Sequence, residues 1–412
     1  MTEKFDIPQA PEKMALQNLT VLDLTRVLAG PFCTMMLADM GARVIKIEIP
    51  GSGDDTRGYP PFRQNKYGKR ESLYFANINR NKKGITLNLK TEQGKRLFLE
   101  LVKKADVVVE NFRPGVMEKL GLGYKELSEV NPRIIYAAVS GFGHYGPYHL
   151  RPGYDIIAQA MGGMMSITGA KGDGPTRAGS ALGDILGGLH LAIGILAAVN
   201  ARNITGRGQQ VDVSLMDSVI AATENTALKY LESGQIPPRM GNRYAAVSPY
   251  DSFQCKDGSI IIAAGNQKLF EKLCTEVLQR PDLVDESRFT DMEGRLKYQD
   301  VLQEVIDGYL KNYTMEDAVN YILSKGIPAG PILNIAQILD DPHVKEREMF
   351  IETEHPTLGT VTINGDAIKL MDTKPAYRTP APALGQDNHE IFRTFLELTE
   401  EEYQLACETG VI

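Results

Sequence analysis

The sequence predicts an α/β protein built on a mainly parallel sheet. Its first 145 residues alternate short apolar or β-branched runs with segments of helical periodicity, and strands that alternate with helices are typical of βαβ units. The chain has 412 residues, which favours two or three domains at about 150 residues each. A change in composition after residue 231 marks the expected start of a different part of the chain.

Each element of the first part has a local signal. Strands are expected at 19–25, 42–49, 84–89, 106–112 and 133–142. Helices are expected at 30–41, 90–105 and 116–130. In the first of these helices, Pro31 stands near the first helical position and Gly41 acts as a stop signal.

The later elements follow in the same way. Residues 184–202 are almost wholly apolar, which predicts a buried helix; a turn and strand at 206–215 and a helix at 216–231 come next. The segment 232–249 is rich in Gly, Pro and polar residues and resembles a linker or lid. Beyond it we expect a hairpin turned at 256–258, helices from 267 to 324, a breaker cluster at 326–334, a second hairpin at 353–366 and a closing helix.

Composition excludes several classes of protein. Lys and Arg number 45 against 52 Asp and Glu, a net charge of −7, which argues against a nucleic-acid partner. The longest apolar run, Leu191–Val199, is shorter than the roughly 18 residues that span a bilayer, so we expect no membrane partner. The four cysteines are scattered, as in a cytoplasmic protein with reduced thiols, and the six histidines show no metal-binding spacing, so no metal is expected.

One motif points to a dinucleotide site but lacks its context. Gly141–Gly146 fits the pattern G-x-G-x-x-G after an expected strand, yet that fingerprint requires a helix through the glycines. Pro147 and Pro152 follow directly and do not suit a helix interior. The motif therefore predicts a loop at the carboxyl end of a strand, where open α/β sheets bind ligands.

Asp184 is the strongest candidate for chemistry. It stands at the entry to the apolar helix, between Gly183 and the pair Gly187 and Gly188. One interpretation is an ordinary N-cap, a position that favours Asp. The other is a carboxylate nucleophile, with small neighbours that admit a bulky ligand.

Cations and histidines give weaker signals. Two segments supply positive side chains: Arg80, Lys82, Lys83, Lys90, Arg113 and Lys119. Most are expected on the solvated surface, and the functional interpretation is a set of phosphate contacts at the carboxyl edge of the sheet. His144 and His149 are candidate general bases, although loop histidines are more often plain surface residues.

Nine stretches, in this order and spacing, resemble the class III coenzyme A transferases, also called the CaiB/BaiF family. They include VLDLTRVLAGPFCTMMLADMGARVIKIE, NRNKKGITLNLK, ENFRPGVMEKLGLGY, GYDIIAQAMGGMMSITG, ALGDILGGLHLAIGILAA and GRGQQVDVSLMDS. The family also contains the α-methylacyl-CoA racemases. The resemblance implies a large Rossmann-like domain from residues 1–232 and 331–412, a small inserted α+β domain at 233–330, and an interlocked homodimer.

The resemblance also assigns roles. Asp184 matches the catalytic aspartate, and CoA is expected along Leu28, Ala29, Leu87, Lys90, Asn111, Phe112, Arg113, Lys119, Arg151, Tyr154 and Asp155. The expected substrates are an acyl-CoA donor and a carboxylate acceptor, with no tightly bound cofactor. Leu28 and Ile49 stand where the formyl-CoA enzyme carries Gln and Arg, which argues against oxalate as acceptor.

Three functions stay open at this point. In a transferase, Asp184 attacks the thioester and CoA passes through an aspartyl intermediate to the acceptor, an exchange of sulfur-containing groups. A racemase of the same family needs a second proton-transfer group, and Tyr154 stands where the racemases carry His. Because an ordinary Tyr has a pKa near 10, this difference favours the transferase. The third candidate is a non-catalytic nucleotide-binding protein.

Overall fold

The computed structural model describes residues 13–412, which form two compact units. The first unit comprises the described residues up to Met164, then Arg177–Leu228 and Lys345–Ile412, and the second comprises Met165–Thr176 and Lys229–Val344. Residues 165–176 were expected in the large part, but they belong to the second unit. Within the second unit this segment is tied by hydrogen bonds from Gly241 N–H to the carbonyl of Gly169 and from Arg239 Nε to the carbonyl of Asp173.

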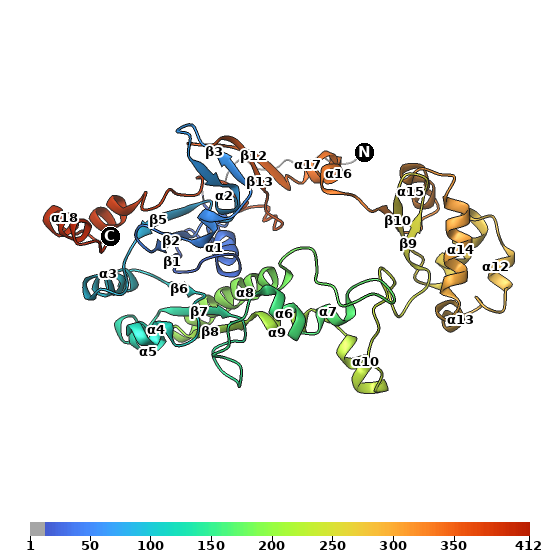
Figure 1. Ribbon diagram of the computed structural model, residues 1–412, viewed down its shortest axis with the longest axis horizontal. Helices are drawn as coiled ribbons and strands as arrows, with labels where there is room; N and C mark the ends of the chain where they lie inside the picture. The colour runs from blue at the N-terminus through green and yellow to red at the C-terminus, as the bar shows by residue number, and fades with distance from the viewer. Residues whose placement is uncertain (1–12) are drawn as a thin grey trace. The chain divides into compact units, whose positions relative to one another are not determined.

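A six-stranded parallel sheet organises the first unit (Figure 1). Its strands are β1 (Thr20–Asp23), β2 (Arg43–Glu48), β5 (Lys82–Thr86), β6 (Val107–Glu110), β7 (Ile135–Ser140) and β8 (Gln210–Ser214). Their spatial order is β5-β2-β1-β6-β7-β8, which is the doubly wound order 3-2-1-4-5-6 when the sheet strands are counted along the chain. The order reverses between β1 and β6, so this is the point where such a sheet binds ligands.

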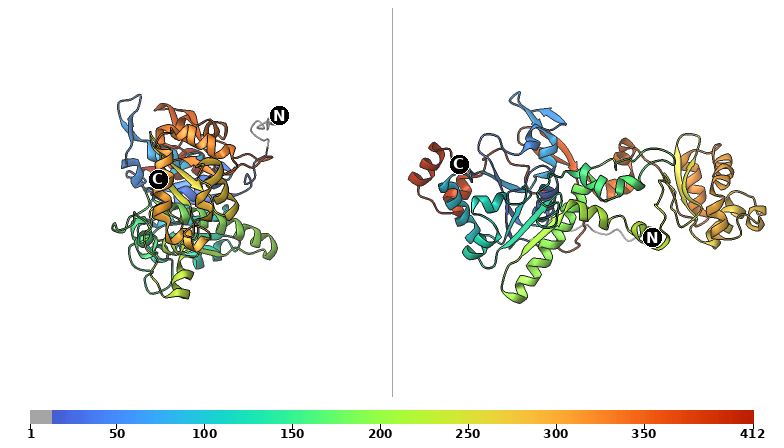
Figure 2. Two further views of the ribbon diagram at one scale, coloured as in Figure 1. Left: turned by 90° about the vertical axis from the view of Figure 1, so that its right-hand side faces the viewer. Right: turned by 60° about the horizontal axis from the view of Figure 1, so that its bottom comes forward.

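Helices cover both faces of this sheet (Figures 1 and 2). The helices of this unit are α1 (Ala29–Asp39), α2 (Leu73–Ile78), α3 (Glu92–Lys103), α4 (Val116–Leu120), α5 (Tyr124–Val130), α6 (Asp155–Met161), α8 (Leu182–Thr205), α9 (Leu215–Ala221) and α18 (Glu400–Glu408). Alternate strand residues face opposite sides, so Leu22 packs with α3, α5 and α18, whereas Val21 packs with α1, α8 and α9. The expected strand and helix alternation is thereby confirmed.

Two helices that the periodicity predicted as continuous are broken. The expected helix at 116–130 is α4 followed by α5, because Gly121 ends α4 in the left-handed region with φ +73°. The expected helix at 216–231 is α9 followed by α10 (Thr226–Ser233), with Glu224 at φ +55° between them. Two antiparallel pairs flank the sheet, β3 (Phe62–Gln64) with β4 (Arg70–Ser72), which the sequence analysis missed, and β12 (Phe350–His355) with β13 (Gly359–Asn364).

The second unit has a three-stranded antiparallel sheet and its own core. The strands are β9 (Tyr250–Gln254), β10 (Ser259–Ala263) and β11 (Ala329–Pro331). The helices are α11 (Gln267–Lys272), α12 (Asp282–Asp285), α13 (Met292–Lys297), α14 (Gln299–Leu310), α15 (Met315–Ser324) and α16 (Ile335–Asp340), while the short α7 (Met164–Ile167) and α17 (Pro342–Glu346) lie where the units join in sequence. The β9–β10 pair confirms the hairpin predicted around 256–258.

The apolar helix α8 is only partly covered. Leu191 and Ile195 are buried against the sheet, but Ile193 is 64% exposed and Ile204 is 80% exposed. The prediction of a helix buried on all sides is therefore wrong for this chain by itself. Among the described residues, α8 is the one helix whose length and composition would also allow it to cross a membrane, a test that core helices of globular proteins pass as well.

Candidate active site

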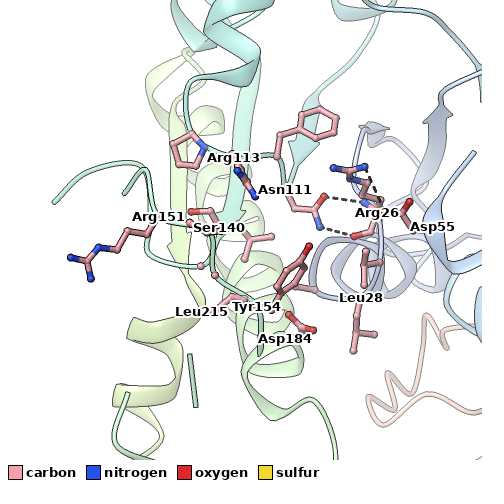
Figure 3. A pocket seen from close by; sticks show the side chains of 18 residues that line it. Arg26, Leu28, Asp55, Asn111, Arg113, Ser140, Arg151, Tyr154, Asp184 and Leu215 are labelled. Carbon is pink, nitrogen blue, oxygen red and sulfur yellow. Dashed lines mark hydrogen bonds and ion pairs between the residues drawn. The ribbon is translucent and has the colours of Figure 1, made fainter. Parts of the chain in front are cut away.

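A cleft with a cavity volume of about 150 Å³ opens at the carboxyl ends of β1, β6 and β7 (Figure 3). Eight of the predicted site residues line it: Leu28, Ala29, Asn111, Phe112, Arg113, Arg151, Tyr154 and Asp184. In the view of Figure 3, Leu28 and Asp184 lie toward one side of the cleft, and Arg113 and Arg151 toward the other. The topological switch point thus gathers residues that are more than 150 positions apart in sequence.

The loop after β1 is held in an unusual conformation. Arg26 N–H donates to Asn111 Oδ1 at 3.0 Å, and Asn111 Nδ2 donates to the Arg26 carbonyl at 2.6 Å. The next residue, Val27, has φ +69°, a value that is rare for a β-branched residue. The N–H of Val27 donates to Asp54 Oδ1 at 3.3 Å. These bonds fix the turn that begins α1 with Leu28 and Ala29 in the cleft wall.

Asp184 does not cap its own helix. It lies in the first turn of α8, two residues after Leu182, and the N-cap position is Ala181. The cap comes instead from α6, where Asp155 Oδ1 accepts the N–H of Gly183 at 2.7 Å. The N-cap interpretation of Asp184 is therefore wrong, and its carboxyl group is left facing the cleft.

The protonation of Asp184 is strongly perturbed. Burial raises the pKa of Asp184, the negative charge of Asp155 raises it further, and the result is about 7. Tyr74 on α2 responds to the same charge, because burial and then Asp184 raise the pKa of Tyr74 to about 12. Sequence reasoning missed Tyr74, since nothing in the sequence brings α2 close to α8.

The glycines beside Asp184 allow other segments of this protein to pack closely against α8, and they do not make room for a ligand. A Cβ on Gly188 would come 2.6 Å from the carbonyl oxygen of Ala29, and one on Gly187 would come 2.5 Å from Leu215. A Cβ on Gly183 would meet Asp155 Oδ1 at 3.1 Å. These contacts bring α8 against α1 and α9 and so place Asp184 next to the α1 turn, which corrects the sequence interpretation.

A second, mainly apolar cleft with a cavity volume of about 490 Å³ adjoins the first and shares Arg26 and Phe112 with it. It is lined by Leu87, Lys90 and Lys119, all predicted from the resemblance. Ile49, also in its wall, is 56% exposed. Apolar side chains with two lysines at the margin are suited to a heterocyclic base that carries phosphates.

Other sequence candidates lie elsewhere. Asp155 lines neither cleft, because its buried carboxylate bonds Gly183 N–H and Gln159 Nε2. Arg80 and Lys82 are buried in ion pairs with Asp39 and Asp23 at 2.8 and 3.0 Å, so neither is a phosphate contact nor a surface charge.

Lys83 pairs with Asp387 and Glu390 near the C-terminal segment. The imidazole of His144 faces Glu110, and His149 Nδ1 lies 2.7 Å from the carbonyl of Gly146. Residues 13–412 contain no cluster of three or more potential metal ligands.

Comparison with known proteins identifies the family of this chain. The sequence model described as "CoA-transferase family III" matches residues 16–388. The chain belongs to CoA-transferase family III. Relatives of this family member include an acetyl-CoA:oxalate CoA-transferase of Acetobacter aceti, 40% identical over 94% of this chain and 97% of the relative. A succinyl-CoA:mesaconate CoA-transferase of Haloarcula marismortui is 43% identical over 92% of this chain and 95% of the relative.

Two further relatives are a human protein and a protein of known crystal structure. The human succinyl-CoA:glutarate CoA-transferase is 36% identical over 96% of this chain and 90% of the relative. The crystal structure of a CaiB/BaiF family protein from Brucella suis is 38% identical, with a TM-score of 0.83 over 93% of this chain and 100% of that one. This family III member is thus a CoA-transferase, as the sequence resemblance predicted.

Proposed function

We propose that this CoA-transferase moves CoA from an acyl-CoA thioester to a short dicarboxylic acid through a covalent intermediate on Asp184. The observation that carries the proposal is the Asp184 carboxyl group, which lines the cleft and has a pKa of about 7. A carboxylate of higher pKa is a stronger nucleophile, and at neutral pH about half of it is ionised. The acceptor class follows from relatives named for mesaconate and glutarate. A third relative is named for oxalate, but Leu28 and Ile49 argue against oxalate itself.

The chemistry is an exchange of acyl groups that needs no net proton. The Asp184 carboxylate attacks the thioester carbonyl and expels CoA thiolate, which leaves an acyl–aspartyl anhydride. The thiolate attacks the aspartyl carbonyl and releases the donor acid, so CoA is now bound to Asp184 as a thioester. The acceptor carboxylate repeats the sequence in reverse, and a new acyl-CoA leaves with Asp184 restored.

The surrounding residues suit these steps. The first turn of α1, at Leu28 and Ala29, presents the N-terminal end of a helix to the cleft, where developing negative charge is stabilised. In the adjoining cleft we place the CoA nucleotide, with Lys90 and Lys119 as phosphate contacts. Arg113 and Arg151, in the Asp184 cleft, are available for the pyrophosphate or for the second carboxylate of a dicarboxylic acid.

The racemase alternative gains no support. A racemase needs a second proton-transfer group in the cleft. Tyr154 lines it, but His144 faces Glu110 instead. We therefore expect no exchange of the α-proton of a 2-methylacyl-CoA at a rate comparable to transfer, which deuterium wash-in measures. Rapid wash-in without transfer to any carboxylate would reverse this ranking.

The decisive experiment is to trap the intermediate. Incubation with an acyl-CoA donor and no acceptor should leave CoA on the peptide that contains Asp184, and borohydride or hydroxylamine should react there. Asp184→Asn should fold, bind CoA and lose transfer, while Asp217→Asn, an exposed-surface control on α9, should keep it. Full activity of Asp184→Asn would exclude the mechanism.

We also propose a homodimer. The outward face of α8, with Ile193 and Ile204 exposed, is the apolar surface that supports it. Sedimentation equilibrium at micromolar concentration should give twice the chain mass, and a stable monomer would contradict the proposal. The cytoplasmic location and the absence of nucleic-acid and membrane partners stay predictions from the sequence.

A further inference from the structure

One buried carboxylate joins two walls of the Asp184 cleft. Glu110, at the end of β6, accepts the N–H of Phe112 at 2.6 Å and so shapes the segment Asn111–Arg113. It also accepts the hydroxyl of Tyr136 on β7 at 3.1 Å. Its Oε1 lies 3.3 Å from Nε2 of His144, which belongs to the loop 141–154. The loop and the segment are therefore connected through this single side chain.

The loop has one further anchor next to the imidazole. The N–H of His144 points at both carboxylate oxygens of Asp212 on β8, at 3.0 and 3.1 Å. Gly143 precedes it with φ +77°, in the left-handed region that turns the chain toward that carboxylate. The far end of the loop carries Arg151 and Tyr154 into the cleft. His144 therefore lies in the same loop as two cleft residues.

The charges that act most strongly on the imidazole are negative. Glu110 from β6, Asp212 from β8 and Glu118 from α4 act on it, and the phenol of Tyr136 is a neutral neighbour of Glu110. Burial, the largest single influence, would by itself lower the pKa of His144. The negative charges of Glu110, Asp212 and Glu118 together outweigh it and raise the pKa above the ordinary value. Within the described part of the chain, Nε2 has no well-aligned hydrogen-bond partner, so its contact with Glu110 depends mainly on charge.

We propose that His144 and Glu110 form a proton-dependent latch that holds the loop 141–154 against the segment Asn111–Arg113 and thereby sets the affinity for CoA esters. The pair positions the binding residues and does not touch the reacting atoms. The inference rests on the proposed function, because it takes the cleft to be the CoA site. Since the pKa of His144 is raised, the latch is fully formed below the ordinary histidine value and is lost as pH rises through the raised one.

The test is the pH dependence of CoA binding. Calorimetry with free CoA should show a dissociation constant for the wild-type protein that rises about threefold to tenfold from mildly acidic to mildly alkaline pH. His144→Gln should remove this rise. His149→Gln is the matched control and should retain the rise, because His149 lies in the same loop and its ring contacts the carbonyl of Gly146 rather than a carboxylate. Comparison of the three proteins cancels the titration of CoA itself, which is common to all.

A second variant and an NMR titration distinguish loss of the latch from misfolding of the His144→Gln protein. Glu110→Gln keeps an oxygen acceptor for the N–H of Phe112 while removing the charge. In an NMR titration it should lower the pKa of His144, and it should flatten the binding curve as His144→Gln does. A kcat that changes less than KM in both variants marks positioning rather than chemistry.

The outcomes separate the two proposals. If wild-type protein binds CoA and His144→Gln keeps the alkaline rise, or if Glu110→Gln leaves the His144 titration in place, the latch is wrong and the CoA site stands. If wild-type protein binds no CoA at any pH, the proposed CoA site is wrong, and the latch proposal, which depends on that site, is wrong as well.

Discussion

The Asp155 carboxylate accepts the N–H of Gly183 at 2.7 Å and caps from outside the helix that carries the next residue, Asp184. Asp155 therefore has two effects on Asp184. It fixes the backbone from which Asp184 projects, and its charge raises the pKa of Asp184. A local N-cap by Asp184 itself would have engaged one of the two oxygens that the proposed chemistry uses.

The first prediction separates the charge of Asp155 from its cap. Asp155→Asn keeps an oxygen for the N–H of Gly183 but removes the negative charge, so the pKa of Asp184 should fall below about 7. The acid limb of the kcat profile should move to lower pH, and kcat at its plateau should drop because the proposed nucleophile is less basic. A stopped assay across the pH range measures both. An acid limb that does not move would contradict the electrostatic role.

The raised pKa of Asp184 also predicts a cost in stability. The folded carboxyl has a pKa of about 7 against an ordinary 3.8, so the folded protein binds more protons than the unfolded chain between these values. Stability should then fall as pH rises through that window, by up to roughly 2–4 kcal/mol from this group. Asp184→Asn should raise the midpoint of thermal unfolding at pH 8 and change it little at pH 4. An equal effect at both values would argue against the shift.

Close packing of α8 on α1 predicts a large effect of one methyl group. Gly188→Ala places a Cβ 2.6 Å from the carbonyl of Ala29, so α8 must move or strain, at about 1–3 kcal/mol of stability. Because both cleft walls depend on this contact, kcat should fall as well. Gly308→Ala in α14 meets no atom within 4 Å and should be neutral or stabilising by about 0.5–1 kcal/mol. Chemical denaturation and steady-state kinetics measure the pair.

The proposed phosphate contacts of Arg113 and Lys119 predict an effect on binding rather than turnover. Replacement of Arg113 and Lys119 together by Ala should raise KM for the acyl-CoA donor by roughly tenfold to hundredfold with a smaller change in kcat. The effect should shrink at high salt, because exposed charges are screened. Arg96→Ala, exposed on α3, is the control. An unchanged KM in the double variant would remove these residues from the CoA site.

The buried pair of Lys82 and Asp23 predicts a structural defect. Lys82 Nζ lies 3.0 Å from Asp23 Oδ2, and both side chains are inaccessible to solvent. Lys82→Met leaves Asp23 buried without its partner, which should cost about 3–5 kcal/mol. Lys103→Met breaks an exposed pair on α3 and should cost less than about 1 kcal/mol. Similar losses of stability in the two variants would show that the buried pair contributes no more to stability than the exposed pair.

Local sequence signals predicted much of the fold and part of the site. The alternation of strands and helices, the β9–β10 hairpin and the loop at Gly141–Gly146 depend on neighbouring residues, so the sequence alone could indicate them. The breaks at Gly121 and Glu224 were missed because the helical periodicity continues across both turns. Eleven of the twelve predicted site residues line one of the two clefts, and the exception is Asp155.

The sequence by itself determined the α/β class, the family resemblance and the candidacy of Asp184, since these depend on the order of residue types along the chain. Only the tertiary structure decided what Asp184 and its neighbours do. Asp155 caps α8 and raises the pKa of Asp184 by its charge. The glycines beside Asp184 are contact points for α1 and α9. Arg80 and Lys82 form buried ion pairs. Burial and the distance between charges set those roles, and both arise only when segments far apart in the chain are packed together.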